Sequence, residues 1–240
     1  MNRSTKISST SEGARSKIVA LSGILSAVVA LLTFLFVPAA IPLGGFDSSS
    51  ILILSLPILL GPELGTIIIC TGEFIGTAFL LAVMGGPLFF LPGIVAVRGP
   101  EAYFVGKIAR GKFLGGSGGK GRETLAAIMG PIWETVGFIA ADYYVYYLMF
   151  GLQVAIINTL IVAWTIIDLI WVVPSIAVIS SVRKWLNANY MDKQMGLEGE
   201  VETKKKLFRI SVIFIILTWI LLFLVPFVFA SWGPPPPSSP

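Results

Sequence analysis

The sequence predicts an all-α integral membrane protein with seven helical spans. Of its 240 residues, 55% are hydrophobic and only 12% are charged, and the mean hydropathy is +0.88. Soluble domains do not show this balance. A helix crosses a bilayer with about 20 mainly apolar residues. Seven runs meet or approach that length: residues 18–37, 51–60, 66–83, 88–108, 125–149, 153–182 and 207–230.

The second span is shorter than the others. Its apolar run, 51–60, contains Pro57, so this span is either tilted and begun near Phe46 or partly re-entrant. Tight turns are expected at 61–65, GPELG, and at 84–87, MGGP, because glycine and proline favour turns. The prolines inside the fourth and fifth spans favour bends in those helices.

The basic residues orient the spans. Sixteen of the seventeen lie on one side of the seven-span arrangement: Arg3, Lys6, Arg15, Lys17, Lys107, Arg110, Lys112, Lys120, Arg122, Arg183, Lys184, Lys193, Lys204, Lys205, Lys206 and Arg209. By the positive-inside rule that side is cytoplasmic, so the N-terminus is expected inside and the C-terminus outside. The net charge of +4 therefore reflects how the chain is oriented in the membrane, and no nucleic-acid partner is expected. The exception is Arg98, in mid-membrane.

These boundaries divide a multi-pass protein of the cell membrane into five parts. No A-x-A-like cleavage site closes the first apolar run, so its polar leader is predicted to be a tail and not a removable signal peptide. The parts are a cytoplasmic tail (1–16), a six-span membrane domain (17–185), a cytoplasmic linker (186–206), a seventh transmembrane helix (207–230) and an extracellular proline-rich tail (231–240).

Several kinds of chemistry are excluded by composition. The chain has no histidine and one cysteine, Cys70, which removes His-ligated metals, HExxH proteases and His-based catalysis. No Walker A sequence is present; GGSGGKGR at 115–122 lacks the Ser/Thr after its lysine. We therefore expect no enzyme, no cofactor and no metal site.

Ionisable residues inside the predicted spans are the main candidates for function. Glu73, Arg98, Glu101, Glu134 and Asp168 lie near mid-membrane, and Asp142 lies nearer the outer face. Glu134, Phe138 and Asp142 share one helix face, with the carboxylates about 12 Å apart along the axis. Arg98 and Glu101, three residues apart, are spaced to pair. The remaining acids are protonated, paired with polar backbone, or in contact with a cation; the alternative to a ligand site is neutralisation by neighbouring helices.

An aromatic stripe accompanies one of these acids. Trp164, Asp168, Trp171 and Ser175 fall within roughly 60° of arc on the sixth span. Aromatic rings beside a carboxylate suit a cationic or aromatic ligand, whereas the alternative is an aromatic core stripe around a neutral aspartic acid. The candidate substrate-binding residues are therefore Arg98, Glu101, Glu134, Asp142, Trp164, Asp168 and Trp171.

The first span carries a strip of small residues. Ser22, Gly23, Ser26, Ala27 and Ala30 cover an arc of about 140° at helical spacing. Such strips let another helix approach closely, so this face predicts a partner. The partner is either an internal helix or a second subunit.

These features together resemble the substrate-binding S component of an energy-coupling factor (ECF) transporter. The matching segments are the small-residue strip, the loop PLGGFDSSS, GPELG followed by GTIIICTGEFIG, and MGGPLFFLPG. The resemblance implies a six-helix bundle over 17–185, with a ligand site toward the outer face capped by the loop between spans 1 and 2. It also implies that an Ala-xxx-Ala surface, with Gly23 and Ala27 at that spacing here, contacts a transmembrane coupling subunit attached to two ATPases.

The function implied by the resemblance is uptake of a vitamin-like small molecule. Excess acid with tryptophan favours a cationic or aromatic ligand, for instance a thiamine-like compound. Two features depart from the family pattern: the seventh helix is additional, and the acids lie deeper than an outer-face site requires. The alternatives are a stand-alone proton- or cation-coupled secondary transporter that uses Glu73, Glu134 and Asp168, and a non-catalytic membrane assembly subunit.

Overall fold

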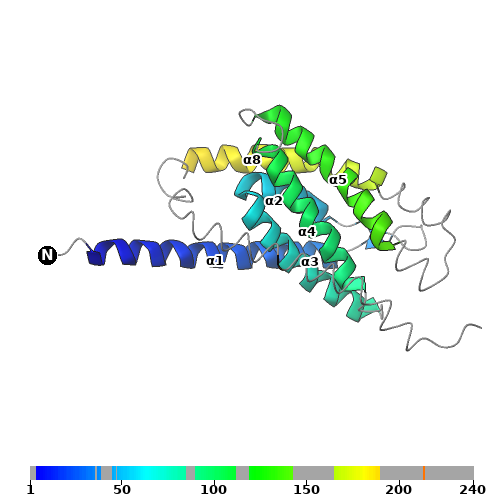
Figure 1. The fold of residues 1–240 in the computed structure, drawn as a ribbon, viewed down its shortest axis with the longest axis horizontal. Helices are drawn as coiled ribbons and strands as arrows, with labels where there is room; N and C mark the ends of the chain where they lie inside the picture. The colour runs from blue at the N-terminus through cyan, green and yellow to red at the C-terminus, as the bar shows by residue number, and fades with distance from the viewer. Residues whose placement is uncertain are drawn as a thin grey trace, which may run out of the picture.

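The computed structural model describes residues 4–35, 37–38, 45–46, 48–84, 90–111, 119–142, 165–189 and 213, which are almost entirely helical. Its elements are α1 (Ser4–Phe34), β1 (Val37–Pro38), β2 (Gly45–Phe46), α2 (Ser50–Leu60), α3 (Pro62–Met84), α4 (Phe90–Ala109), α5 (Lys120–Asp142) and α8 (Val172–Asn189). Figure 1 shows these helices gathered into one bundle, with the N-terminal part of α1 extending beyond it. The all-α prediction is confirmed for this part of the chain, apart from two short strands.

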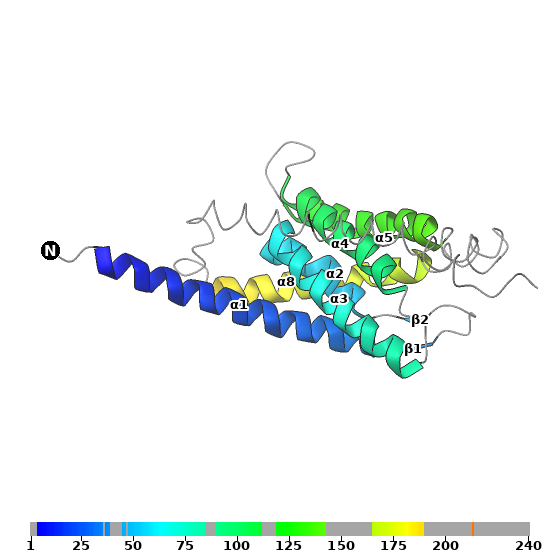
Figure 2. The same ribbon diagram turned by 60° about the horizontal axis from the view of Figure 1, so that its bottom comes forward.

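The strands are a two-residue antiparallel pair between α1 and α2. Val37 pairs with Phe46 and Pro38 pairs with Gly45. The pair lies at the end of the bundle where α1 ends and α2 begins, because β1 follows α1 and β2 precedes α2 (Figure 2). The second span therefore does not begin near Phe46, since that residue is in a strand and the helix begins at Ser50.

The short helix α2 lies at the centre of the bundle and packs against α3, α4, α5 and α8. One apolar cluster, shared with α4, α5 and α8, contains Leu54, Ile58, Val105, Ala109, Ala126, Ala127, Val172 and Ile179. A second, shared with α1, α3 and α4, contains Val29, Ile53, Leu56, Leu64, Ile68, Ile69 and Ala102. At the end of α2, Gly61 adopts a φ of 102°, and α3 starts at the next residue, Pro62. The turn expected at 61–65 therefore consists of Gly61 alone.

Three described helices are long and apolar enough to cross a membrane, judged by length and composition: Pro62–Val83, Lys120–Ala141 and Thr165–Lys184. Two further apolar helices, Ile18–Phe34 and Ser50–Leu60, are shorter, and α4 carries Arg98, Glu101 and Lys107. Large apolar side chains that are more than half exposed include Val19, Ile24, Phe79, Val83, Val136, Ile166 and Val173. Such surfaces suit contact with lipid. Apart from residue 213, the predicted span 207–230 lies outside the described residues, as does nearly all of the linker before it.

Helix α1 begins well before its apolar part. It starts at Ser4, within the segment predicted as a cytoplasmic tail. Residues 4–17 contain no proline and one glycine, Gly13, so nothing in the backbone interrupts the helix before the apolar residues begin.

The small-residue strip of α1 divides into two rows. The inner row, Ser22, Ser26 and Ala30, faces the bundle: Ser26 Oγ donates to the carbonyl oxygen of Ile68, 3.2 Å away on α3, and Ala30 is buried. The outer row, Gly23 and Ala27, is exposed. The internal helix expected as a partner is therefore α3 for the inner row, while the outer row lies uncovered among the described residues.

Close approach of α1 and α3 depends on glycines in α3. A Cβ added at Gly72 or Gly76 would lie within 3 Å of α1, against Val29 and the Ser26 carbonyl in one case and the Ala30 carbonyl in the other. Such distances cannot be relieved by a side-chain rotation, because backbone atoms of α1 are involved.

We predict that Gly76→Ala destabilises the protein by about 1–3 kcal/mol, because the added methyl forces α1 and α3 apart. Gly23→Ala is the matched control, since nothing lies within 4 Å of the added Cβ. The thermal midpoint of the detergent-purified protein measures both. Equal midpoints for the two variants would contradict this packing.

Candidate functional site: a buried arginine among four carboxylates

Arg98 of α4 forms ion pairs with two glutamates. Its Nη1 lies 3.2 Å from Glu101 Oε2, one turn later on α4, and also contacts Glu134 Oε2 on α5. The exposed fraction is 5% for Arg98, 1% for Glu101 and 4% for Glu134. The predicted pairing of Arg98 with Glu101 is confirmed, and Glu134 joins α5 to the same guanidinium.

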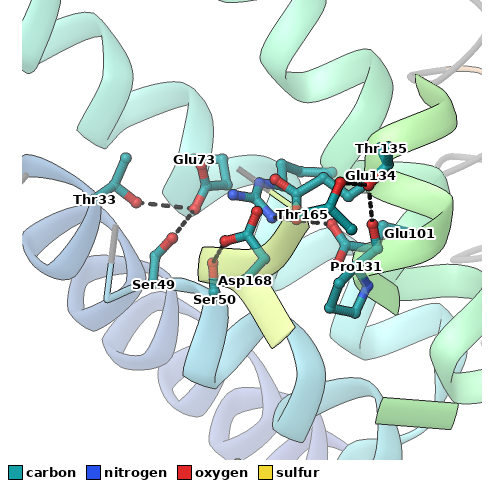
Figure 3. A network of polar contacts seen from close by, with 11 residues as sticks. Thr33, Ser49, Ser50, Glu73, Glu101, Pro131, Glu134, Thr135, Thr165 and Asp168 are labelled. Atoms are coloured by element: carbon teal, nitrogen blue, oxygen red, sulfur yellow. Dashed lines mark hydrogen bonds and ion pairs between the residues drawn. The ribbon is translucent and has the colours of Figure 1, made fainter. Parts of the chain in front are cut away.

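Further groups surround the guanidinium. Its Cζ lies 5.8 Å from the centroid of the Phe138 ring, a cation–π distance. The carboxylates of Glu134, Glu101, Asp168 and Glu73 all stabilise its positive charge electrostatically. We call Arg98 and these four acids the Arg98 cluster. Figure 3 shows the acids from α3, α4, α5 and the segment before α8 converging on one region.

Glu73 is held at the side of the cluster next to α1. Its Oε1 lies 2.9 Å from the hydroxyl of Thr33 near the end of α1 and 2.7 Å from the hydroxyl of Ser49, immediately before α2 (Figure 3). Its exposed fraction is 1%. Glu73 thus contacts both ends of the chain segment that holds β1 and β2.

Asp168 lies at an irregularity in its helix. Residues 165–170 are helical, Trp171 is in a turn, and α8 starts at Val172. Pro174 has no backbone N–H to donate to the carbonyl four residues earlier, and the N–H of Trp171 donates to the Asp168 carbonyl, three residues back and 3.1 Å away. The helix therefore tightens at this point, next to the acid.

The Asp168 carboxylate meets a hydroxyl from α2. Ser50 Oγ donates to Asp168 Oδ1 over 3.4 Å (Figure 3). Thr165, one helical turn before Asp168, contacts Thr135 of α5 through their hydroxyl groups. Thr135 also lies 2.7 Å from the Pro131 carbonyl oxygen, to which it donates. Hydroxyl groups of Thr33, Ser49 and Ser50 thus form hydrogen bonds with Glu73 and Asp168, while the Thr135–Thr165 contact joins α5 to the segment before α8.

Four of the predicted substrate-binding residues are brought together: Arg98, Glu101, Glu134 and Asp168. Trp171 is near Asp168, and its buried Nε1 has no hydrogen-bond acceptor among the described residues. Trp164 lies outside the described residues, and of Asp142 the structure places only the backbone, at the end of α5. Between Asp168 and Ser175 the stripe is not one regular helix face, because of the turn at Trp171.

Glu73 was predicted to be a deep acid but lies outside the predicted binding set, which also lacks Thr33, Ser49 and Ser50. A signal for the two serines was present: they directly precede the apolar run 51–60, where hydroxyl residues commonly begin helices. Thr33 carries no comparable signal, because its role depends on how α1 packs on α3.

The chemical character of the cluster follows from its charges. Four acids face one arginine, so the fully ionised Arg98 cluster has more negative than positive charge; three of these acids are buried and Asp168 is half-buried. Such an excess is costly in low dielectric unless protons or a cation compensate it. Among the described residues, no group of three or more acid or cysteine side chains is arranged to hold a metal ion. The excess of acid in the cluster suits protons, hydrogen-bond donors or a cation.

Two other ion pairs lie apart from the cluster. Lys107 Nζ is 3.6 Å from Glu63 Oε1, linking α4 to α3, and Arg183 Nη1 is 2.6 Å from Glu123 Oε1, linking α8 to α5. Both pairs are partly exposed, so each contributes little to stability. They provide matched controls for the buried pairs.

We predict that Arg98→Met destabilises the protein by about 3–5 kcal/mol, because it leaves Glu101 and Glu134 buried without their cation. The thermal midpoint should fall by about 2–4 °C for each kcal/mol. Lys107→Met, which removes a partly exposed pair, should cost less than about 1 kcal/mol. Similar midpoints for the two variants would show that the cluster does not depend on Arg98.

Comparisons with protein-family models, with curated proteins and with solved structures find no match to this chain. The site is accordingly assigned from its geometry and chemistry. Its defining contacts are those of Arg98 with Glu101 and Glu134, of Glu73 with Thr33 and Ser49, and of Asp168 with Ser50.

Proposed function

We propose that the chain is the substrate-specific membrane subunit of an ECF-type transporter, taking up a vitamin-like small molecule that is cationic or aromatic. Separate coupling and ATPase subunits would supply the energy. The observation that carries the proposal is the Arg98 cluster, where four acids surround one arginine inside an apolar helical bundle. An organic cation entering this region would offset negative charge that Arg98 alone does not balance.

The residues around Asp168 supply complementary recognition. The buried Trp171 Nε1–H, which lacks an acceptor among the described residues, would donate to an oxygen or nitrogen of the ligand. The indole ring would stack on an aromatic ligand, and Asp168 would pair with its positive charge. The ligand class is thus an aromatic ring that bears both a positive charge and a hydrogen-bond acceptor.

The proposed topology is a six-helix domain over 17–185 and an additional seventh span at 207–230. The N-terminus would be cytoplasmic and the C-terminus outside the cell, as the basic residues predict. In this orientation β1 and β2 lie toward the outside, where the loop that contains them would cap the ligand site (Figure 2).

The outer row of α1 is the proposed docking surface for the coupling subunit. Gly23 and Ala27 are exposed and have the four-residue spacing of small residues that permits close helix contact. The inner row is already used by α3, so the two rows of the strip would serve an internal and an external partner.

A second candidate function is a stand-alone transporter coupled to protons or cations. The same excess of buried acid favours it, because Glu73, Glu134 and Asp168 could exchange protons during transport. Uptake by the isolated chain in proteoliposomes, driven by a proton gradient, would support this candidate and exclude a subunit that depends on ATPases.

The proposed function predicts that Asp168→Asn weakens ligand binding by about 10- to 100-fold, the equivalent of one charge-assisted hydrogen bond. The ligand is first identified by thermal shifts of the purified protein over a panel of vitamins. Glu123→Gln, an acid paired with Arg183 away from the cluster, should bind as the wild type does. Unchanged affinity in a well-folded Asp168→Asn protein would remove Asp168 from the site.

It also predicts that Ala27→Leu abolishes co-purification of ATPase subunits while leaving ligand affinity unchanged, because the larger side chain blocks close helix approach. Ala140→Leu makes the same substitution at an exposed position of α5 and should preserve the complex. Both variants are captured by affinity tag from native membranes, and the bound subunits are identified by mass spectrometry. Retention of the ATPases by Ala27→Leu would place the coupling surface elsewhere.

A further inference from the structure

Ser55 is a buried polar residue in the middle of α2, where its neighbours in the sequence are apolar. Its exposed fraction is 0%, and its hydroxyl has no hydrogen-bond partner among the described residues. A buried hydroxyl without a partner destabilises a protein more than an alanine would at the same position. Ser55 therefore calls for a hydrogen-bonding group that the packed side chains around it do not supply.

Ser175 of α8 lies beside Ser55. In α2 the N–H of Ser55 donates to the carbonyl oxygen of Ile51, four residues earlier, as in any regular α-helix. The same oxygen lies 3.3 Å from Ser175 Oγ, so serines from two helices border one carbonyl group. Ser175 is also fully buried. Polar groups shielded from bulk solvent are thus gathered at the contact between α2 and α8.

The hydrogen-bonding capacity of Ser175 is only partly used. Its hydroxyl has one proton and two acceptor lone pairs. The proton faces two carbonyl oxygens, that of Trp171 at 2.6 Å and that of Ile51 at 3.3 Å, and the shorter distance favours Trp171. Among the described residues, Ser175 Oγ then lacks a donor, and the Ile51 oxygen keeps a lone pair that faces it.

Rotation of the Ser55 side chain does not satisfy all of these groups. A direct bond from Ser55 to either neighbour, Ser175 Oγ or the Ile51 carbonyl oxygen, leaves the lone pair of the other unused. A water molecule has two protons and can also accept, so it matches one donor and two acceptors. Buried water molecules in proteins typically make about three hydrogen bonds to polar groups that would otherwise lack partners.

We propose that the contact between α2 and α8 binds one water molecule between Ser55 and Ser175. The water accepts from the Ser55 hydroxyl and donates to Ser175 Oγ and to the Ile51 carbonyl oxygen. Because Ser50 already meets Asp168 at the start of α2, the water extends the polar part of this contact by five residues, or about 7.5 Å along α2. The site is independent of the proposed function, since no ligand of the Arg98 cluster takes part in it.

Radiolytic labelling of the purified protein in H₂¹⁸O tests for the water directly. Hydroxyl radicals formed from a bound water react with adjacent side chains, and tandem mass spectrometry locates the ¹⁸O. Ile58, one turn after Ser55 and buried in the cluster shared with α8, should be labelled. Ile69, equally apolar and buried in the other cluster, is the control. Ser55→Ala/Ser175→Ala should reduce the labelling of Ile58 to that of Ile69. Equal labelling of the two isoleucines in the wild type would overturn the proposal.

Thermal midpoints give an independent readout, because the competing explanations differ in sign. Ser55→Ala should lower the midpoint by about 2–4 °C, the loss of one hydrogen bond in a chain of this size, whereas removal of a hydroxyl without any partner would raise it. Since the water bridge is lost only once, Ser55→Ala/Ser175→Ala should melt close to Ser175→Ala alone.

Ser22→Ala is the control for these midpoints. The Ser22 hydroxyl donates to the carbonyl four residues earlier, as that of Ser175 does, so this variant measures the loss of that bond without the bridge. Ser175→Ala should therefore lower the midpoint further than Ser22→Ala. A higher midpoint for Ser55→Ala, or losses that add in the double variant, would refute the bridge.

Discussion

The structure depends on the cost of placing charge inside an apolar helical bundle. Arg98 is the group that makes Glu101 and Glu134 tolerable there, because one guanidinium can pair with two carboxylates from different helices. Hydroxyl groups of Thr33 in α1, Ser49 just before α2 and Ser50 in α2 form hydrogen bonds with the other two acids, Glu73 and Asp168. The cluster is thus balanced partly by charge and partly by hydrogen bonds, which leaves it sensitive to any added proton or cation.

Backbone features bring these polar groups to one depth. The central helix α2 has 11 residues, too few to cross a bilayer with about 20, so its polar start at Ser49 and Ser50 lies inside the bundle next to Glu73 and Asp168. The tightening of the helix before Pro174 sets Asp168 opposite that start. A short helix and an interrupted helix therefore meet at the cluster.

The sequence predicts the class of fold and most of the charged residues of the Arg98 cluster, because both follow from local composition. Apolar runs with acids at mid-span are visible in the chain itself, and the three-residue spacing of Arg98 and Glu101 predicts their pair. The contact of Arg98 with Glu134 and that of Thr33 with Glu73 are not predictable in this way. They depend on which helix faces pack together, and that is decided by glycines such as Gly76 and by the central place of α2.

Helix α1 connects the interior of the protein to its surface. Thr33 contacts the cluster through Glu73, while Ala27, six residues or about 9 Å earlier along the axis, lies exposed in the outer row. A rigid helix transmits a small displacement at one end to the rest of its length, because its packing on Gly72 and Gly76 leaves few intermediate positions. Under the proposed function, a ligand bound at the Arg98 cluster and a coupling subunit docked on the outer row would act on the same helix. Occupancy of the site and binding of the partner would then be thermodynamically linked, each altering the affinity of the other by the same factor.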